Sequence, residues 1–186
     1  PPPAVDPVLV SMHVEKAVHN IFSDAKSIEY LKAREPIGAR DTATQQFLEG
    51  IGVKAFLSYC MTTTFMPIVS KELRERQSCP SLVVDVDPKL LSRFPDRIVS
   101  QSCSASPKWF DDGSKITRNG VMRYTKAFEL LEQYASAKLV ITSRLHSALP
   151  AAAFGVPVVL VMGTSMPGGG NGHDGRFSGL QELVHT

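Results

Sequence analysis

One stretch near the end of the chain, residues 138–155, places the strongest constraint on the fold. The apolar run 138–142 is typical of a buried strand, and it ends at Ser143, a residue type that favours the N-cap of a helix. An alanine-rich stretch, residues 147–154, predicts a helix immediately afterwards, and Gly155 is expected to end it. A strand that turns directly into a helix is the repeating unit of a parallel α/β sheet.

The start of this predicted helix also carries chemistry. Arg144 and His146 fall in its expected first turn. The first backbone N–H groups of a helix have no intrahelical partner, and the helix dipole adds about half a positive charge there. A guanidinium and an imidazole beside these groups predict a site for a phosphate or a carboxylate, with a proton donor within reach.

The same alternation of strand and helix recurs along the chain and predicts an α/β protein built from Rossmann-like parallel sheets. The expected strands cover residues 7–13, 36–40, 53–59, 82–86, 96–102 and 156–162. The expected helices cover residues 23–34, 42–51, 88–94 and 119–137, and a last one begins near Phe177. The pattern predicts a partial N-terminal α/β domain over 1–66, a linker or crossover over 67–80, and a C-terminal Rossmann-like domain over 81–186.

Two of these helices carry finer predictions. Thr42 and Gln45 have the spacing of a capping box at the start of their helix. The helix over 119–137 has apolar residues at the spacing of one buried face. That face consists of Tyr124, Ala127, Phe128, Leu131, Tyr134 and Ala135.

Composition excludes several classes of protein. Of the 186 residues, 43% are hydrophobic and 20% charged, as in a globular protein. The formal net charge is +2 and no dense run of Lys and Arg occurs, so nothing predicts a nucleic-acid partner. No apolar run is long enough to predict a membrane span. The chain begins without Met or a signal-like segment, and we expect it to be a piece of a longer protein.

The three cysteines, Cys60, Cys79 and Cys103, match no zinc-binding or redox pattern. We expect mostly structural thiols in a reducing, cytoplasmic setting. One disulfide stays open as an alternative, as does a Golgi lumen for a eukaryotic parent.

Several other polar residues fall at expected strand ends, where ligands bind in parallel sheets. Arg40 is either an anion-binding residue or the partner of a nearby carboxylate such as Asp41, and His13 is expected to be packed. Asp85 and Asp87 could form a metal pair, but Pro88 directly after Asp87 favours a helix cap, and no metal site is predicted.

The glycine-rich loop over residues 163–175 lacks the spacings of a nucleotide-binding loop. We expect it to close over an acceptor, with His173 and Asp174 as candidate sugar contacts and plain solvation as the alternative. Trp109 and Phe110 either stack on a sugar ring or form a small hydrophobic cluster.

Four segments, in this order, resemble the polysaccharide pyruvyl transferase family. They are residues 36–41 (PIGARD), 58–64 (SYCMTTT), 143–148 (SRLHSA) with 151–159 (AAAFGVPVV), and 176–180 (RFSGL). Family members open with a strand and a loop containing Gly, Asn or Asp. This chain lacks that opening, so we expect a truncated N-terminal domain.

The resemblance implies a two-domain fold like that of the GT-B glycosyltransferases. It implies transfer of pyruvate from phosphoenolpyruvate onto two hydroxyls of a glycan sugar, as a cyclic ketal with release of phosphate, without a cofactor. It places His146 as the proton donor and Arg144, Leu145 and Ser143 at the donor, with Arg40 as a second donor-binding arginine. The alternatives are a GT-B-like glycosyltransferase that uses a sugar nucleotide, and a fragment that binds anions or glycans without catalysis.

Overall fold

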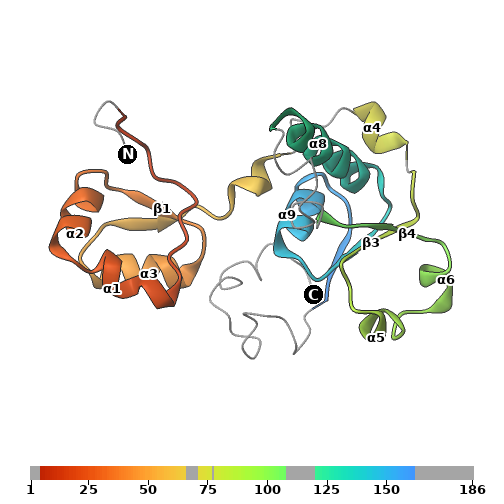
Figure 1. Cartoon of the computed structure of the whole chain (residues 1–186), viewed down its shortest axis with the longest axis horizontal. Coiled ribbons are helices and arrows are strands. Elements are labelled where there is room, and N and C mark those ends of the chain that lie inside the picture. Colours follow the sequence, from red (N-terminus) through yellow and green to blue (C-terminus); the bar gives the residue numbers. More distant parts are fainter. Residues whose placement is uncertain (1–4, 66–70, 77, 108–119, 162–186) are drawn as a thin grey trace. The chain divides into compact units, whose positions relative to one another are not determined.

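A computed structural model of the chain describes residues 5–65, 71–76, 78–107 and 120–161. It is an α/β protein with parallel sheets, as the sequence predicts. The chain divides into two compact units, with a boundary between Met61 and Thr62 (Figure 1). The described part of unit 1 is residues 5–61 and that of unit 2 is residues 62–161.

Unit 1 contains a parallel pair of strands, β1 (Ile37–Ala39) and β2 (Ala55–Leu57). The strand expected over 7–13 is present only as extended backbone beside β1, joined to it by a single parallel bridge between Met12 and Ala39. Gly38 is required in β1 because a Cβ at this position would lie 2.8 Å from Ser58 Oγ.

Four helical segments accompany this pair of strands among the described residues of unit 1. They are η1 (Lys16–Val18), α1 (His19–Phe22), α2 (Ala25–Lys32) and α3 (Thr42–Gly50). A further short segment, η2 (Met61–Thr64), lies at the boundary with unit 2. The core of unit 1 consists of Leu31, Ile37, Leu48 and Val53.

The predicted capping box at the start of α3 is wrong by one residue. Asp41 is the N-cap, and its carboxylate accepts a hydrogen bond of 2.8 Å from the Thr44 N–H. Asp and Thr are both common N-cap residues. The contact of the Asp41 carboxylate with His13 favours Asp41 at this position. The predicted end of the helix is confirmed, because Gly52 has a φ of +78° just after the last turn.

Unit 2 is built on a parallel sheet that has four strands in the described part of the chain. They are β3 (Ser81–Val84), β4 (Ser102–Ala105), β5 (Val140–Thr142) and β6 (Val158–Leu160). Their spatial order is β4-β3-β5-β6. The chain leaves β3 toward β4 and leaves β5 toward β6, so its connections diverge between β3 and β5. The carboxyl ends of such a pair border the crevice in which parallel sheets bind ligands.

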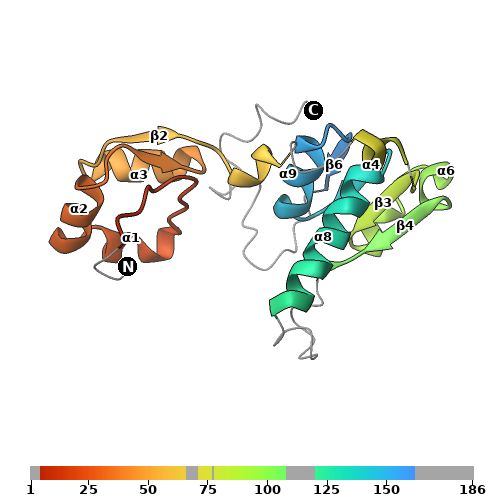
Figure 2. The same cartoon turned by 90° about the horizontal axis from the view of Figure 1, so that it is seen from above.

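The helices of unit 2 are α4 (Lys71–Glu75), α5 (Pro88–Leu91), α6 (Asp96–Val99), α8 (Gly120–Ser136) and α9 (Leu145–Ala153). The long helix α8 and the helix α9 pack against the sheet (Figure 2). They contribute Tyr134, Ala135 and Ala151 to the core, and Phe154, directly after α9, also belongs to it. Leu73 of α4, in the stretch expected to be a linker, packs against this same core.

The strand expected over 96–102 is wrong. Residues 96–99 form α6, and the strand β4 begins three residues later at Ser102. Pro95 precedes the helix with a φ of −55°, and Asp96 places a carboxylate in its first turn. Both features favour a helix start, and they outweigh the β-branched Ile98 and Val99.

The buried face predicted for α8 is correct only for its second half. Tyr134 and Ala135 are buried, whereas Tyr124 is 73% and Phe128 is 55% exposed. A helix of 17 residues is about 25 Å long, and strands of three or four residues span only about 10–13 Å. The helix therefore extends past the sheet that its apolar face would cover (Figure 2).

The cysteine prediction also needs correction. Cys79 and Cys103 form a disulfide with a Cα–Cα distance of 6.2 Å, and only Cys60 is a buried thiol. The bridge joins the residue two positions before β3 to the neighbouring strand β4. Parallel pairing of two strands brings the two sulfurs together, and sequence spacing does not reveal such a neighbour.

Several expectations lie outside the described residues. They concern the loop over 163–175 with His173 and Asp174, the helix expected near Phe177, and Trp109 with Phe110. Among the helices that are described, none combines the length and the apolar character needed to cross a bilayer.

Candidate functional site

The candidate site lies at the carboxyl ends of β3 and β5, where the chain connections diverge. Two hydroxyls tie these strand ends together. The Thr142 hydroxyl donates a hydrogen bond of 3.0 Å to the Val84 carbonyl, and the Ser143 hydroxyl donates one of 2.5 Å to the Asp85 carbonyl. These two hydrogen bonds hold the residues that follow β3 and the residues that follow β5 at a fixed distance from each other.

Asp85 directly follows β3 and lies at the site. Its φ of +50° lies in the left-handed region, which Asp tolerates better than most residues. Its carboxylate Oδ2 accepts a hydrogen bond from Arg144 Nε and forms an ion pair with it. The Asp85 side chain is 11% exposed and that of Arg144 is 40% exposed. The carboxylate is therefore mostly buried, while the guanidinium reaches solvent.

The sequence alone does not reveal Asp85 as the partner of Arg144. The two residues are far apart in the sequence, and their contact depends on β3 and β5 being neighbours. An acidic residue at the end of one buried strand and a basic residue at the end of another were the only available signals.

Ser143 does not cap α9 as predicted. The N-cap is Arg144, with φ −105° and ψ 123°, and α9 begins at Leu145. The Ser143 hydroxyl is committed to the Asp85 carbonyl, and Thr142 Oγ1 accepts the Arg144 N–H at 3.0 Å. The Ser143 hydroxyl, which the local sequence predicts as the cap of α9, is used instead in a long-range hydrogen bond to Asp85.

The first turn of α9 presents free backbone donors. The N–H groups of Ser147 and Ala148 both donate to the Arg144 carbonyl, at 3.1 and 3.0 Å. Within the described part of the chain, no acceptor is found for the N–H groups of Leu145 and His146. Two adjacent free amides at the positive end of a helix suit an oxyanion.

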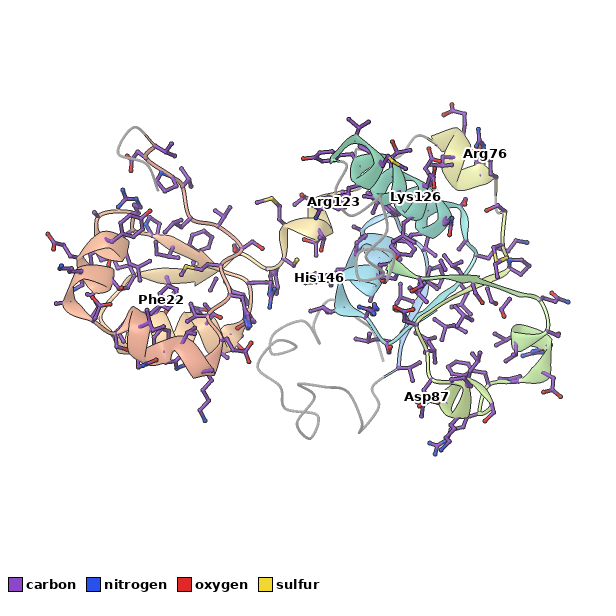
Figure 3. All side chains as sticks on the ribbon, viewed as in Figure 1. Phe22, Arg76, Asp87, Arg123, Lys126 and His146 are labelled. Carbon is purple, nitrogen blue, oxygen red and sulfur yellow. A yellow bond between two sulfur atoms is a disulfide. The ribbon has the colours of Figure 1, made fainter. Side chains whose placement is uncertain are left out.

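His146 lies on α9 (Figure 3) and is exposed, whereas the five residues after it, 147–151, are all buried. No hydrogen-bond or ion-pair partner of its imidazole is found among the residues that the structure describes. His146 is therefore not a packed core histidine. The imidazole is free to meet a ligand at the same turn that carries the free amides.

Tyr134 contacts this turn from its buried side. Its hydroxyl donates a hydrogen bond of 2.9 Å to Ser147 Oγ, and both residues are buried. Burial raises the pKa of Tyr134 above its usual 10.0, and the Ser147 hydrogen bond opposes this rise. The Asp85 carboxylate raises the pKa further and Arg144 lowers it, so all these groups share one electrostatic environment.

Arg40, the second predicted donor-binding residue, lies in unit 1 directly after β1. Its Nε is 3.7 Å from Oδ2 of Asp41, which is fully buried, and its side chain is 13% exposed. The same carboxylate oxygen accepts from His13 Nδ1 at 2.7 Å. Pairing of Arg40 with a neighbouring carboxylate, one of the two readings of the sequence, is therefore present.

Asp87 belongs to a helix cap, as the sequence favours. Its carboxylate accepts a hydrogen bond of 2.8 Å from the Lys89 N–H at the start of α5. In the described ranges, no cluster of three or more His, Cys, Asp or Glu residues could hold a metal ion.

A family model for polysaccharide pyruvyl transferase matches residues 10–165. That range includes Arg40, Asp85, Arg144 and His146. No curated protein matches the chain.

Proposed function

Since the chain belongs to the polysaccharide pyruvyl transferase family and is a transferase of that kind, we propose that its donor is phosphoenolpyruvate and its product a cyclic pyruvate ketal on a glycan sugar. One observation supports this proposal above the others. Arg144, the exposed imidazole of His146 and two free backbone amides lie together at the carboxyl ends of β3 and β5.

Phosphoenolpyruvate carries a carboxylate and a phosphate on one small carbon frame. The planar guanidinium of Arg144 suits a two-point contact with either group. The free N–H groups of Leu145 and His146 suit the other group. Ser143 contributes indirectly, because its hydrogen bond to Asp85 fixes the chain just before Arg144.

The chemistry requires an acid at the donor. We assign His146 to protonate the methylene carbon, which leaves an oxocarbenium-like centre at the neighbouring carbon. A sugar hydroxyl attacks that carbon, phosphate departs, and a second hydroxyl closes the ketal. The two hydroxyls lose two protons; the methylene gains one and the phosphate takes the other. Backbone amides at the helix start would stabilise the charge on the departing phosphate.

Finer parts of the proposal come from the family resemblance. Arg40 is proposed as a second donor-binding arginine, and His173 and Asp174 as contacts of the acceptor sugar. We also propose a GT-B-like two-domain fold, and no cofactor besides the donor substrate.

The test is release of inorganic phosphate from phosphoenolpyruvate in the presence of a galactoside or an N-acetylmannosamine acceptor. We expect release to require both substrates. His146→Ala should abolish turnover while donor binding, measured by calorimetry, is retained, and Arg144→Ala should weaken donor binding itself.

Three results would contradict the proposal in different ways. Thermal stabilisation by UDP or GDP but not by phosphoenolpyruvate would indicate a sugar-nucleotide glycosyltransferase. Donor binding without phosphate release would indicate a binding fragment. Unchanged phosphate release in both His146→Ala and Arg144→Ala would place the site elsewhere.

A further inference from the structure

We propose that Asp85 is a positioning residue that holds the Arg144 guanidinium by one edge, so that Arg144 meets the donor oxyanion end-on. This inference rests on the proposed function. The contact that supports it is the hydrogen bond from Arg144 Nε to Asp85 Oδ2.

A guanidinium has five N–H donors and can bind a planar oxyanion along two edges. One edge combines Nε with a terminal nitrogen, and the other combines the two terminal nitrogens. Asp85 occupies Nε and thereby removes the first edge. The second edge stays available for a two-point contact, on a side chain that is 40% exposed.

Asp85 is itself held in place. Its carbonyl accepts the Ser143 hydroxyl at 2.5 Å, and the Thr142 hydroxyl holds the preceding carbonyl of Val84. The carboxylate is 11% exposed, so few other partners compete for it. The anchor of the guanidinium is therefore built into the pairing of β3 with β5.

A positioning role and a purely electrostatic role of Asp85 predict opposite effects on donor binding. The negative charge of Asp85 alone opposes the binding of an anion beside it. A carboxylate that only tuned charge would weaken donor binding, and its removal would strengthen it. A carboxylate that positions Arg144 fixes this long side chain before the donor binds, so that binding costs less side-chain entropy. Removal of such a carboxylate would weaken donor binding.

The experiment measures the dissociation constant of phosphoenolpyruvate by calorimetry in Asp85→Gly and Asp85→Asn. Glycine adopts the φ of +50° without strain and removes the carboxylate. Asparagine tolerates the same φ and keeps an acceptor oxygen. We expect weaker binding by about tenfold in Asp85→Gly and a smaller loss in Asp85→Asn, since immobilising one long side chain is worth about this factor.

Asp87→Asn is the matched control. It alters a carboxylate two residues away that caps α5, and it should leave the dissociation constant unchanged. In an Arg144→Lys background, Asp85→Gly should not weaken binding further, because lysine has no Nε to hold. Equal or tighter binding in Asp85→Gly, or the same tenfold loss in the lysine background, would overturn the proposal.

A second readout is independent of the donor. The Nε–H of Arg144 should give a slowly exchanging signal in an ¹⁵N correlation spectrum, assigned by its loss in Arg144→Lys. Asp85→Gly should accelerate its exchange to that of an exposed arginine, and unchanged exchange would refute the anchoring. If the wild-type chain does not bind phosphoenolpyruvate, the proposed function fails while this measurement still decides whether Asp85 holds Arg144.

Discussion

The Tyr134 hydroxyl donates a 2.9 Å hydrogen bond to Ser147 Oγ, and this buried contact joins α8 to the first turn of α9. Ser147 follows His146 directly, so the exposed imidazole sits on a turn that is tied to the core from its other side. The contact connects the packing of unit 2 with the position of its candidate acid.

Replacement of Tyr134 by Phe should lower the free energy of unfolding by about 1 kcal/mol, because one buried hydrogen bond is lost and Ser147 Oγ loses its partner. Urea denaturation measures the change. Tyr124→Phe, at an exposed position on the same helix, should change the free energy by less than about 0.5 kcal/mol. Equal effects of the two substitutions would contradict the role of the contact.

Tyr134 should also make unit 2 sensitive to alkali. Burial raises the pKa of Tyr134 above 10.0, so the folded state favours the protonated phenol more than the unfolded state does. This contribution to stability is fully present below pH 10.0 and is lost as the pH rises through the folded pKa. Urea unfolding on both sides of that pH should show a smaller alkaline loss in Tyr134→Phe than in the wild type. A loss of equal size would contradict the prediction.

Local patterns predicted much of this fold correctly. The strands β1, β3 and β5 and the helices α2, α3, α8 and α9 lie within or close to their expected ranges. The glycine that ends α9, Gly155, has the expected positive φ of +79°. These features depend on hydrophobic spacing and backbone preference within a few residues, which a sequence displays directly.

The errors lie where a distant partner decides the outcome. Ser143 gives its hydroxyl to Asp85 and so cannot cap α9, and Cys79 meets Cys103 only because β3 and β4 are paired. The partner of Arg144 likewise depends on strand order, which no local pattern reveals. The residue types of the site were therefore predictable, while the contacts that orient them were not.

Asp24 provides a prediction at acid pH in unit 1. Its carboxylate caps α2 by accepting from the N–H groups of Lys26 and Ser27 and from the Ser27 hydroxyl. The Ser27 side-chain hydrogen bond is the largest cause that lowers the pKa of Asp24 below 3.8. The stabilisation is present above pH 3.8 and is lost as the pH falls through the folded pKa.

Asp24→Asn should remove this acid dependence while it keeps an acceptor for the cap, and Asp24→Ala should lose the cap at every pH. Circular dichroism during urea unfolding at neutral and at acid pH measures both effects. Identical pH profiles for the wild type and Asp24→Asn would refute the assignment.

Asp41 should be the most sensitive polar position of unit 1. It is fully buried, caps α3 through Thr44, and its other oxygen accepts from His13 at 2.7 Å with Arg40 Nε 3.7 Å away. Asp41→Ala removes the cap and leaves these two side chains facing an apolar methyl group. We expect a loss of about 3 kcal/mol in the free energy of unfolding, as for other buried ion pairs that lose one partner. Asp41→Asn keeps the cap acceptor and loses only the charge, so its loss of stability should be clearly smaller in the same urea titration.

If the alanine and asparagine variants were equally destabilised, the charge rather than the cap would account for the role of Asp41. If neither were destabilised, the buried cluster would contribute nothing to the stability of unit 1.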